Sequence, residues 1–198
     1  DGHILTVTMN RPERMNALHS PSHFEMDEIF NDFESDPELW VAIVTGAGDK
    51  AFSAGNDLKW QAEGKKTDPP ASGFAGLVNR FNMKKPIIGA VNGLAMGGGF
   101  EVALACDIII AADNAFFALP EPRVGLAALA GGLHRLSRQI PMKQAMGMIL
   151  TGRRVMAEEG YKLGFVTEVV PEGGALEGAR RWAELISECS PVSIRTSK

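Results

Sequence analysis

The 198-residue chain has few of the residues that mark metal, redox or disulfide-rich proteins. Its two cysteines, Cys106 and Cys189, lie far apart and have no CxxC spacing, so a disulfide scaffold is excluded and a reducing compartment is expected. Its four histidines show neither HExxH nor a paired ligand spacing. We therefore expect no metal site and no catalytic histidine.

Charge and hydropathy exclude further classes. The net charge of −4 provides no basic face for nucleic acid. The apolar run from Pro86 to Ala112 contains Asn92, Glu101 and Asp107, whereas a membrane span needs about 20 mostly apolar residues. No basic and then apolar leader follows Asp1. We expect a cytoplasmic protein, with an organelle matrix as the alternative, and neither a nucleic-acid nor a membrane partner.

Strand-like and helical patterns alternate along the chain, which predicts an α/β fold. Strands are expected at residues 3–9, 40–45, 87–91, 108–112, 115–119 and 165–170. Helices are expected at residues 20–35, 74–83, 130–139, 142–151, 157–163 and 175–189, and directly after the triple glycine Gly97–Gly99. Ser20 is the expected cap of the first helix, and Phe24 is expected on its apolar face. The polar stretch 61–72 predicts a mobile surface loop.

Two other enzyme folds can be set aside. Residues 46–51 form a GxGxxA after a strand, but the dinucleotide-binding fingerprint requires these glycines to open an amphipathic helix, with an acidic residue about 20 positions later. Residues 52–57 continue instead as a second extended and turning segment. A serine hydrolase is not favoured, because no GxSxG elbow with matching His and Asp is present.

The stretch from Pro86 to Asp107, PIIGAVNGLAMGGGFEVALACD, is mostly apolar but contains a carboxylate and three consecutive glycines, which an ordinary buried segment would not need. Glu101 stands among apolar residues, where a carboxylate costs free energy unless it is paired. The triple glycine Gly97–Gly99 exposes backbone, and the helix after it aims N–H groups outward. We expect Gly98 to be a donor to a bound anion. Close packing of the turn against a strand, and a dipole role for Glu101, are the alternatives.

Residues 53–57, SAGND, form a second turn of small residues before a helix. An ordinary turn capped by Asn56 or Asp57 is the alternative here. Together the two turns could place two backbone donors on one oxygen, which is what an oxyanion hole requires. Glu121 lies between two prolines and would by itself be a solvent-facing turn residue. If the fold brings it to Glu101, the pair can serve as general acid and base.

Three motifs carry a resemblance to one family. They are AFSAGNDL at residues 51–58, KPIIGAVNGLAMGGGFEVALACDIIIAA at 85–112 and FALPEPRVGL at 117–126. Together they resemble the enoyl-CoA hydratase/isomerase (crotonase) superfamily, most closely an enoyl-CoA hydratase, over nearly the whole chain. The resemblance implies a spiral of ββα units with a helical C-terminal region. Family members generally run longer, with residues before Asp1 and helices after Lys198.

The resemblance also implies a domain plan and an assembly. Residues 1–198 would form one domain, with a spiral core to about residue 140 and a helical region with the last strand at about 141–198. A homotrimer or a dimer of trimers, which is a homohexamer, is expected. The implied substrate is an acyl-CoA thioester, so coenzyme A belongs to the substrate and no separate cofactor is expected.

The site residues follow from the same resemblance. It places an oxyanion hole at the N–H groups of Asn56 and Gly98, and the two hydratase glutamates at Glu101 and Glu121. The implied substrate-binding residues are Ser53, Ala54, Asn56, Asp57, Leu58, Lys59 and Gly98, and the turn 11–17 approaches the nucleotide.

Two carboxylates favour a hydratase or dehydratase, since one can take a proton from water while the other protonates C2. A carnitinyl-CoA dehydratase is a close alternative. A Δ3-Δ2-enoyl-CoA isomerase is another, although isomerases commonly keep only the carboxylate at the Glu121 position. The non-enzyme alternative is an acyl-CoA-binding scaffold protein. One departure from the family is that Ala128-Leu129, in place of a Pro-Gly pair, precede Ala130-Gly131-Gly132, so we expect a different acyl-pocket shape there.

Overall fold

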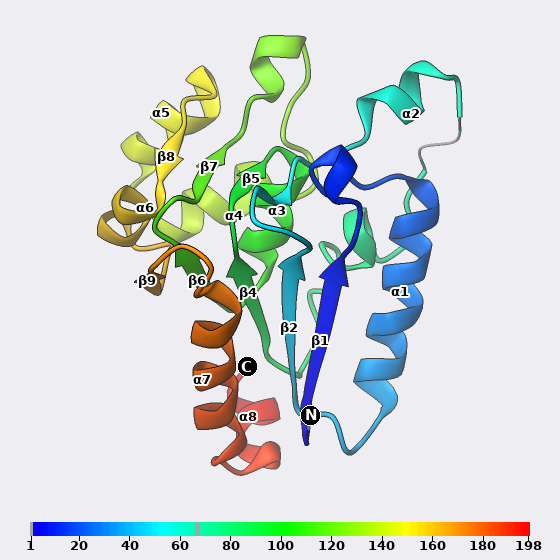
Figure 1. Cartoon of the computed structure of the whole chain (residues 1–198), viewed down its shortest axis with the longest axis vertical. Coiled ribbons are helices and arrows are strands. Elements are labelled where there is room, and N and C mark those ends of the chain that lie inside the picture. The colour runs from blue at the N-terminus through cyan, green and yellow to red at the C-terminus, as the bar shows by residue number, and fades with distance from the viewer. Residues whose placement is uncertain (1, 66–67) are drawn as a thin grey trace.

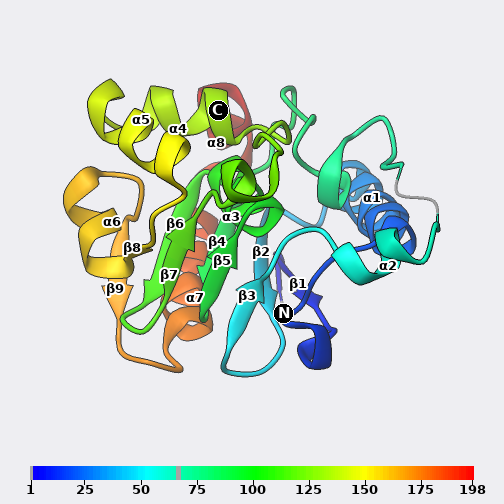
Figure 2. The same ribbon diagram turned by 90° about the horizontal axis from the view of Figure 1, so that it is seen from above.

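A computed structural model of the chain describes residues 2–65 and 68–198. Two β-sheets form its centre (Figures 1 and 2). The five-stranded sheet has the order β1-β2-β4-β6-β9 and is parallel throughout, whereas the four-stranded sheet, β3-β5-β7-β8, is parallel except for its last pair. The strands are β1 (Ile4–Met9), β2 (Val41–Gly46), β3 (Ala51–Ser53), β4 (Ile87–Val91), β5 (Leu94–Met96), β6 (Ile108–Ala112), β7 (Phe116–Ala118), β8 (Val155–Met156) and β9 (Glu168–Val170).

Successive units of the chain divide their strands between the two sheets. In the pairs β2-β3, β4-β5 and β6-β7, the first strand joins the larger sheet and the second joins the smaller one. The helices are α1 (Ser20–Ser35), α2 (Leu58–Ala62), α3 (Gly98–Ala105), α4 (Gly132–Gln139), α5 (Met142–Thr151), α6 (Ala157–Leu163), α7 (Ala175–Ser187) and α8 (Pro191–Ser197). Three 3-10 turns are η1 (Pro12–Arg14), η2 (Phe74–Gly76) and η3 (Glu121–Val124). The spiral of ββα units and the α/β class are confirmed.

The core lies between the sheets and under their covering helices. Helix α7 packs across β2, β4 and β6, and α3 packs against β5 and α4. The rings of Phe100, Phe117 and Phe165 meet with centroids 5.1–5.2 Å apart, which ties α3 and β7 to the segment before β9. No helix in the described ranges is both long and apolar enough to cross a bilayer.

Most predicted elements are present, but several expectations were wrong. The cap of α1 is His19, whose Nδ1 accepts from Ser22 N–H, and Phe24 is 48% exposed. The predicted strand 165–170 is formed only at its end, as β9. The short elements β5, β8 and α8 were not expected. The expected loop 61–72 begins inside α2, and its residues 66–67 lie outside the described residues.

The predicted helix 74–83 is not formed. Only the 3-10 turn η2 occupies its start, and Gly73, Ala75 and Gly76 all have positive φ. An α-helix requires negative φ at every residue, so these conformations cannot be part of one. The apolar residues of the segment are still buried, with Leu77 and Val78 in the core. The apolar spacing correctly indicated that these side chains are buried, but it was misleading about the helix, because an irregular segment buries them equally well.

Substitution of Gly99 tests how closely the turn after β5 packs against the end of β3. A Cβ at Gly99 would collide with the carbonyl oxygen of Ser53. We expect Gly99→Ala to lower the free energy of unfolding by about 1–3 kcal/mol. Gly147→Ala is the matched control, because a Cβ at this position in α5 meets nothing within 4 Å and removes only a helix-destabilising glycine. Urea unfolding measures both, and equal stability of the two variants would contradict the close approach.

Candidate active site

The candidate site forms at the carboxyl ends of three neighbouring strands. Because β3, β5 and β7 are parallel, these ends lie at one edge of the smaller sheet (Figure 2). Asn56 follows β3, Gly98 follows β5 and Glu121 follows β7, each within three residues of the strand's end. The topology therefore brings together segments that are far apart in the sequence.

The turns after β3 and β5 touch through their backbones. Gly55 has φ +85°, and a Cβ there would lie 2.8 Å from the nitrogen of Gly98 and 2.7 Å from the carbonyl oxygen of Met96. An L side chain at Gly55 would thus be strained and would also collide with the neighbouring turn. Glycine at this position allows Asn56 and Gly98 to be neighbours.

The backbone N–H groups of Asn56 and Gly98 take no part in the backbone hydrogen bonds that surround them in the described structure. Asn56 pairs with Leu18 in an isolated parallel bridge, in which Leu18 N–H donates to Gly55 and Leu18 O accepts from Asp57 N–H, both at 2.8 Å. The N–H of Asn56 itself takes no part in this bridge. Gly98 is the first residue of α3, where N–H groups have no intrahelical acceptor. Within the described part of the chain, neither N–H has an acceptor.

Glu101 lies on the first turn of α3 and is only 3% exposed. Its Oε1 accepts a hydrogen bond of 2.9 Å from Gly132 N–H at the start of α4. Burial raises the pKa of Glu101 to about 7; the Gly132 hydrogen bond opposes this rise, and the nearby charge of Glu121 adds to it. The carboxyl group is therefore able to exchange a proton near neutral pH.

Glu121 is half-buried and is not a solvent-facing turn residue. A Cβ at Gly97 would lie 3.0 Å from its Oε1, so the carboxyl group lies over Gly97, next to Gly98. Its Oε2 is buried and has no hydrogen-bond partner among the described residues. Burial raises the pKa of Glu121, against the effect of its own backbone N–H. The structure thus brings both glutamates to the edge that carries the two N–H groups.

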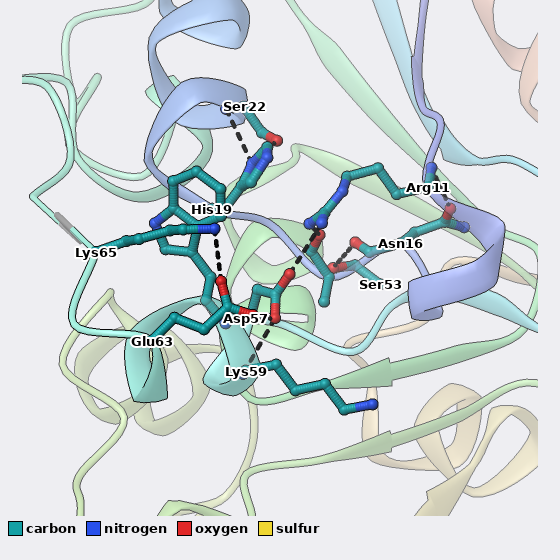
Figure 3. A network of polar contacts seen from close by, with 11 residues as sticks. Arg11, Asn16, His19, Ser22, Ser53, Asp57, Lys59, Glu63 and Lys65 are labelled. Atoms are coloured by element: carbon teal, nitrogen blue, oxygen red, sulfur yellow. Dashed lines mark hydrogen bonds and ion pairs between the residues drawn. The ribbon is translucent and has the colours of Figure 1, made fainter.

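A polar network surrounds Asp57, the residue after Asn56 (Figure 3). Asp57 accepts from Lys59 N–H and Trp60 N–H at the start of α2, and it forms an ion pair of 2.9 Å with Arg11. Burial alone would raise the pKa of Asp57, but the hydrogen bonds from Trp60 and Arg11 outweigh it and hold the pKa below its usual value. Asp57 is therefore a fixed anion that orients Arg11.

The buried part of this network fixes the turn that carries Asn56. Asn16 is fully buried, and its Nδ2 donates to the carbonyl oxygens of Ala47 and Ala51 at 3.0 and 2.7 Å. Ser53 Oγ donates to Asn16 O and accepts from Gly55 N–H. The hydroxyl of Ser53 is thus fully occupied inside the protein, and only its backbone is available to a ligand.

The remaining predicted binding residues lie nearer the surface. Leu58 and Lys59 are exposed, and Ala54 is partly exposed. Figure 3 shows the Lys59 side chain extending away from the network. A cavity of about 480 Å³ between β1 and α1 is lined in part by Arg11, Asn16, Leu18 and His19. The predicted turn 11–17 thus borders a cavity next to this network.

Three contributors to the site were not predicted from the sequence. Gly132 supplies the hydrogen bond to Glu101, and its position in a glycine pair was the available signal. Arg135 donates to Val78 O at 2.7 Å, while its Nη1 is buried without a partner among the described residues. Phe74 packs against Gly98, through a contact that no local pattern reveals. The described residues contain no cluster of side chains that could hold a metal ion.

Comparison with known proteins gives the family. The sequence model of the enoyl-CoA hydratase/isomerase family matches residues 1–198. The chain belongs to the enoyl-CoA hydratase/isomerase family. This confirms the resemblance that the three motifs carry, and it agrees with the two-sheet spiral described above.

Relatives within this family are named for both directions of one reaction. The chain is 47% identical over 200 residues to the carnitinyl-CoA dehydratase of Escherichia coli strain K12, with 100% of the chain and 76% of the relative covered. Carnitinyl-CoA hydratase from Mycobacterium avium has a TM-score of 0.96 at 41% identity, with 100% and 76% covered. Enoyl-CoA hydratase from Mycobacterium tuberculosis H37Rv has a TM-score of 0.94 at 38% identity, with 100% and 77% covered.

The raised pKa of Glu101 predicts a pH-dependent effect of neutralising it. The native state holds this proton up to pH 7, whereas the unfolded chain releases it near pH 4.5, so wild-type stability falls between these values. Glu101→Gln removes this loss and keeps an acceptor for Gly132 N–H. We expect the variant to be more stable than wild type by about 2–3 kcal/mol at pH 8, and by almost nothing at pH 4. Urea unfolding at both pH values tests this, and a stability difference independent of pH would contradict it.

Proposed function

We propose that the protein is an enoyl-CoA hydratase, which reversibly adds water to the double bond of a 2-enoyl-CoA thioester. One observation carries this proposal: two buried carboxyl groups with raised pKa values lie beside two backbone N–H groups that have no acceptor in the described protein. Family membership supports the same reading. Coenzyme A enters as part of the substrate, and we propose no further cofactor.

The two N–H groups suit the thioester carbonyl. Donors from Asn56 and Gly98 would polarise the carbonyl and stabilise the enolate-like state that follows attack at C3. Each donor of such a hole lowers the barrier by about 2.7–4 kcal/mol. Because Asn56 and Gly98 lie on rigid turns, little reorganisation accompanies the reaction.

The glutamates suit the two proton transfers. Glu101, held by Gly132 N–H, is the group we assign to take a proton from the attacking water. Glu121 lies over Gly97 and has a buried Oε2 without a partner among the described residues, so we assign it to protonate C2. In the reverse direction the roles exchange and water is lost.

The coenzyme A part of the substrate would occupy the side with Asp57, Leu58 and Lys59. Arg11 is held by Asp57 and by Ala17 O at 2.5 Å, which directs a cation along the turn 11–17. Lys59 is exposed and supplies a second cation for phosphate groups. The backbone of Ser53 and Ala54 completes the proposed binding surface.

A carnitinyl-CoA dehydratase is the second candidate, because the name of the 47% identical relative from Escherichia coli favours it. The same carboxyl pair would serve it, so the substrate decides between the two. Turnover of carnitinyl-CoA with little turnover of crotonyl-CoA would favour the dehydratase. Double-bond migration without hydration would indicate an isomerase, and binding without any turnover would indicate a scaffold protein.

Substitution of each glutamate tests the proposed reaction. We expect wild-type protein to hydrate crotonyl-CoA, with Glu101→Gln and Glu121→Gln each lowering kcat by a factor of about 10²–10⁴ because a proton-transfer group is lost. Loss of the ultraviolet absorbance of the enoyl thioester measures the rate. Glu172→Gln is the matched control, because Glu172 is an exposed carboxylate away from the site. Full activity in both site variants would refute the glutamate assignment.

We further propose that the protein acts as a homotrimer or a dimer of trimers in the cytoplasm. Leu126, Leu133 and Leu150 are exposed, yet they line one apolar groove of about 200 Å³, which supports a subunit contact there. Cys106 and Cys189 are both free thiols, which supports a reducing compartment.

Light scattering tests the assembly. The expected mass is three or six times the 21.3 kDa of one chain. Leu150→Glu is expected to lower this mass, because a charge would enter the apolar groove, whereas Tyr161→Glu on α6 serves as the control for an exposed apolar side chain outside this groove. A monomeric wild-type protein would contradict the proposal.

A further inference from the structure

The side chain of Phe74 packs against Gly98, in the turn after β5 that carries one of the two proposed oxyanion-hole donors. A Cβ at Gly98 would be 2.6 Å from Cζ and 2.7 Å from Cε1 of the Phe74 ring. The Phe74 ring thus occupies the space that a side chain at position 98 would need. The ring edge therefore lies at van der Waals distance from the residue whose N–H we assign to the thioester oxygen.

The turn that carries Phe74 is held in a strained conformation. Ala75 has φ +57°, which is unfavourable for a residue with a Cβ. Its N–H donates to Nδ1 of the buried His23 at 3.1 Å, and the His23 ring packs on Phe74 with centroids 4.4 Å apart. The next residue, Gly76, lies so close to the backbone of α1 at Asp27 that no Cβ would fit. These contacts fix the position of the Phe74 ring.

Two arginines hold the residues that follow. Arg80 Nε donates to Gly76 O at 2.7 Å, and its Nη2 forms an ion pair of 2.6 Å with Asp27. Arg135 of α4 donates to Val78 O at 2.7 Å. The segment 74–80 therefore extends from Gly98 to α4, the helix whose first residue binds Glu101.

We propose that Phe74 is a specificity-determining residue, which forms a fixed wall beside the oxyanion hole and restricts the substrate to short acyl chains. This inference rests on the proposed function, because it assumes that an acyl-CoA thioester binds at Asn56 and Gly98. In this proposal a short enoyl group lies between the wall and the glutamates. A longer chain has to pass the ring, on which His23 packs, while Arg80 and Arg135 hold the backbone of the residues that follow it.

Binding of saturated acyl-CoA thioesters tests the wall without requiring turnover. Calorimetry on the full chain compares butyryl-CoA with octanoyl-CoA for wild type and for Phe74→Ala. We expect wild type to favour butyryl-CoA, and Phe74→Ala to shift the affinity ratio toward octanoyl-CoA by about tenfold or more, since a methylene accepted by an apolar pocket is commonly worth about tenfold or more. Phe74→Leu, which keeps an apolar contact with Gly98, should shift the ratio less and serves if the alanine variant fails to fold.

The control is Phe24→Ala, because Phe24 is a 48% exposed phenylalanine on α1, next to His23 in sequence. It should leave the ratio unchanged. An unchanged ratio in the folded Phe74 variants would overturn the inference, even with full hydratase activity. A shifted ratio in a protein that hydrates no enoyl-CoA would support the wall and refute the proposed reaction. Absence of acyl-CoA binding in wild type would overturn both.

Discussion

The site depends on one close backbone contact, between the turn after β3 and the turn after β5. Gly55 and Gly99 allow it, because a side chain at either position would collide with the opposite turn. With this contact formed, the N–H groups of Asn56 and Gly98 lie on adjacent turns, and the first turn of α3 is set against the smaller sheet. Glu101 lies on that turn, so its position follows from the same contact. The absence of side chains at Gly55 and Gly99 is thus the constraint that determines where the two N–H groups and the Glu101 carboxyl group lie.

The electrostatic features of the site oppose stability and support reactivity. Burying Glu101 and Glu121 near each other disfavours ionisation of both, and one hydrogen bond from Gly132 only partly offsets this for Glu101. A fold selected for stability alone would place apolar residues at such positions. Asp57 shows the contrasting case, since its ion pair and cap hydrogen bonds hold it ionised as part of the scaffold. The proposed proton-transfer groups are therefore the carboxyl groups that the protein leaves incompletely satisfied.

The sequence patterns predicted the long elements well and the contacts between distant segments poorly. Helix α5 and helix α6 were predicted at their observed bounds, because their apolar spacing and glycine ends are local signals. The predicted helix 74–83 failed since the residues with positive φ at its start, Ala75 and Gly76, are held by His23 and Asp27 of α1, 52 and 49 residues away. Glu101 was detectable as an acid in an apolar turn. Glu121 was only a conditional candidate, because its burial depends on the neighbouring strand end, and the family resemblance was needed to assign it.

Hydration and dehydration of an acyl-CoA are one reaction run in two directions, so relatives named hydratase and dehydratase require no different glutamates. What must differ between substrates is the space around C4 and beyond. In our proposal that space is bounded by Phe74, which packs on Gly98, and by the segment before α4, where Ala128 packs against Gly132 and Leu129 is 81% exposed. The catalytic pair and the N–H donors are set by short, sterically fixed turns, whereas these two walls are carried by irregular segments. On the proposed assignment, substrate choice can therefore vary at the walls while the proton transfers by Glu101 and Glu121 stay the same.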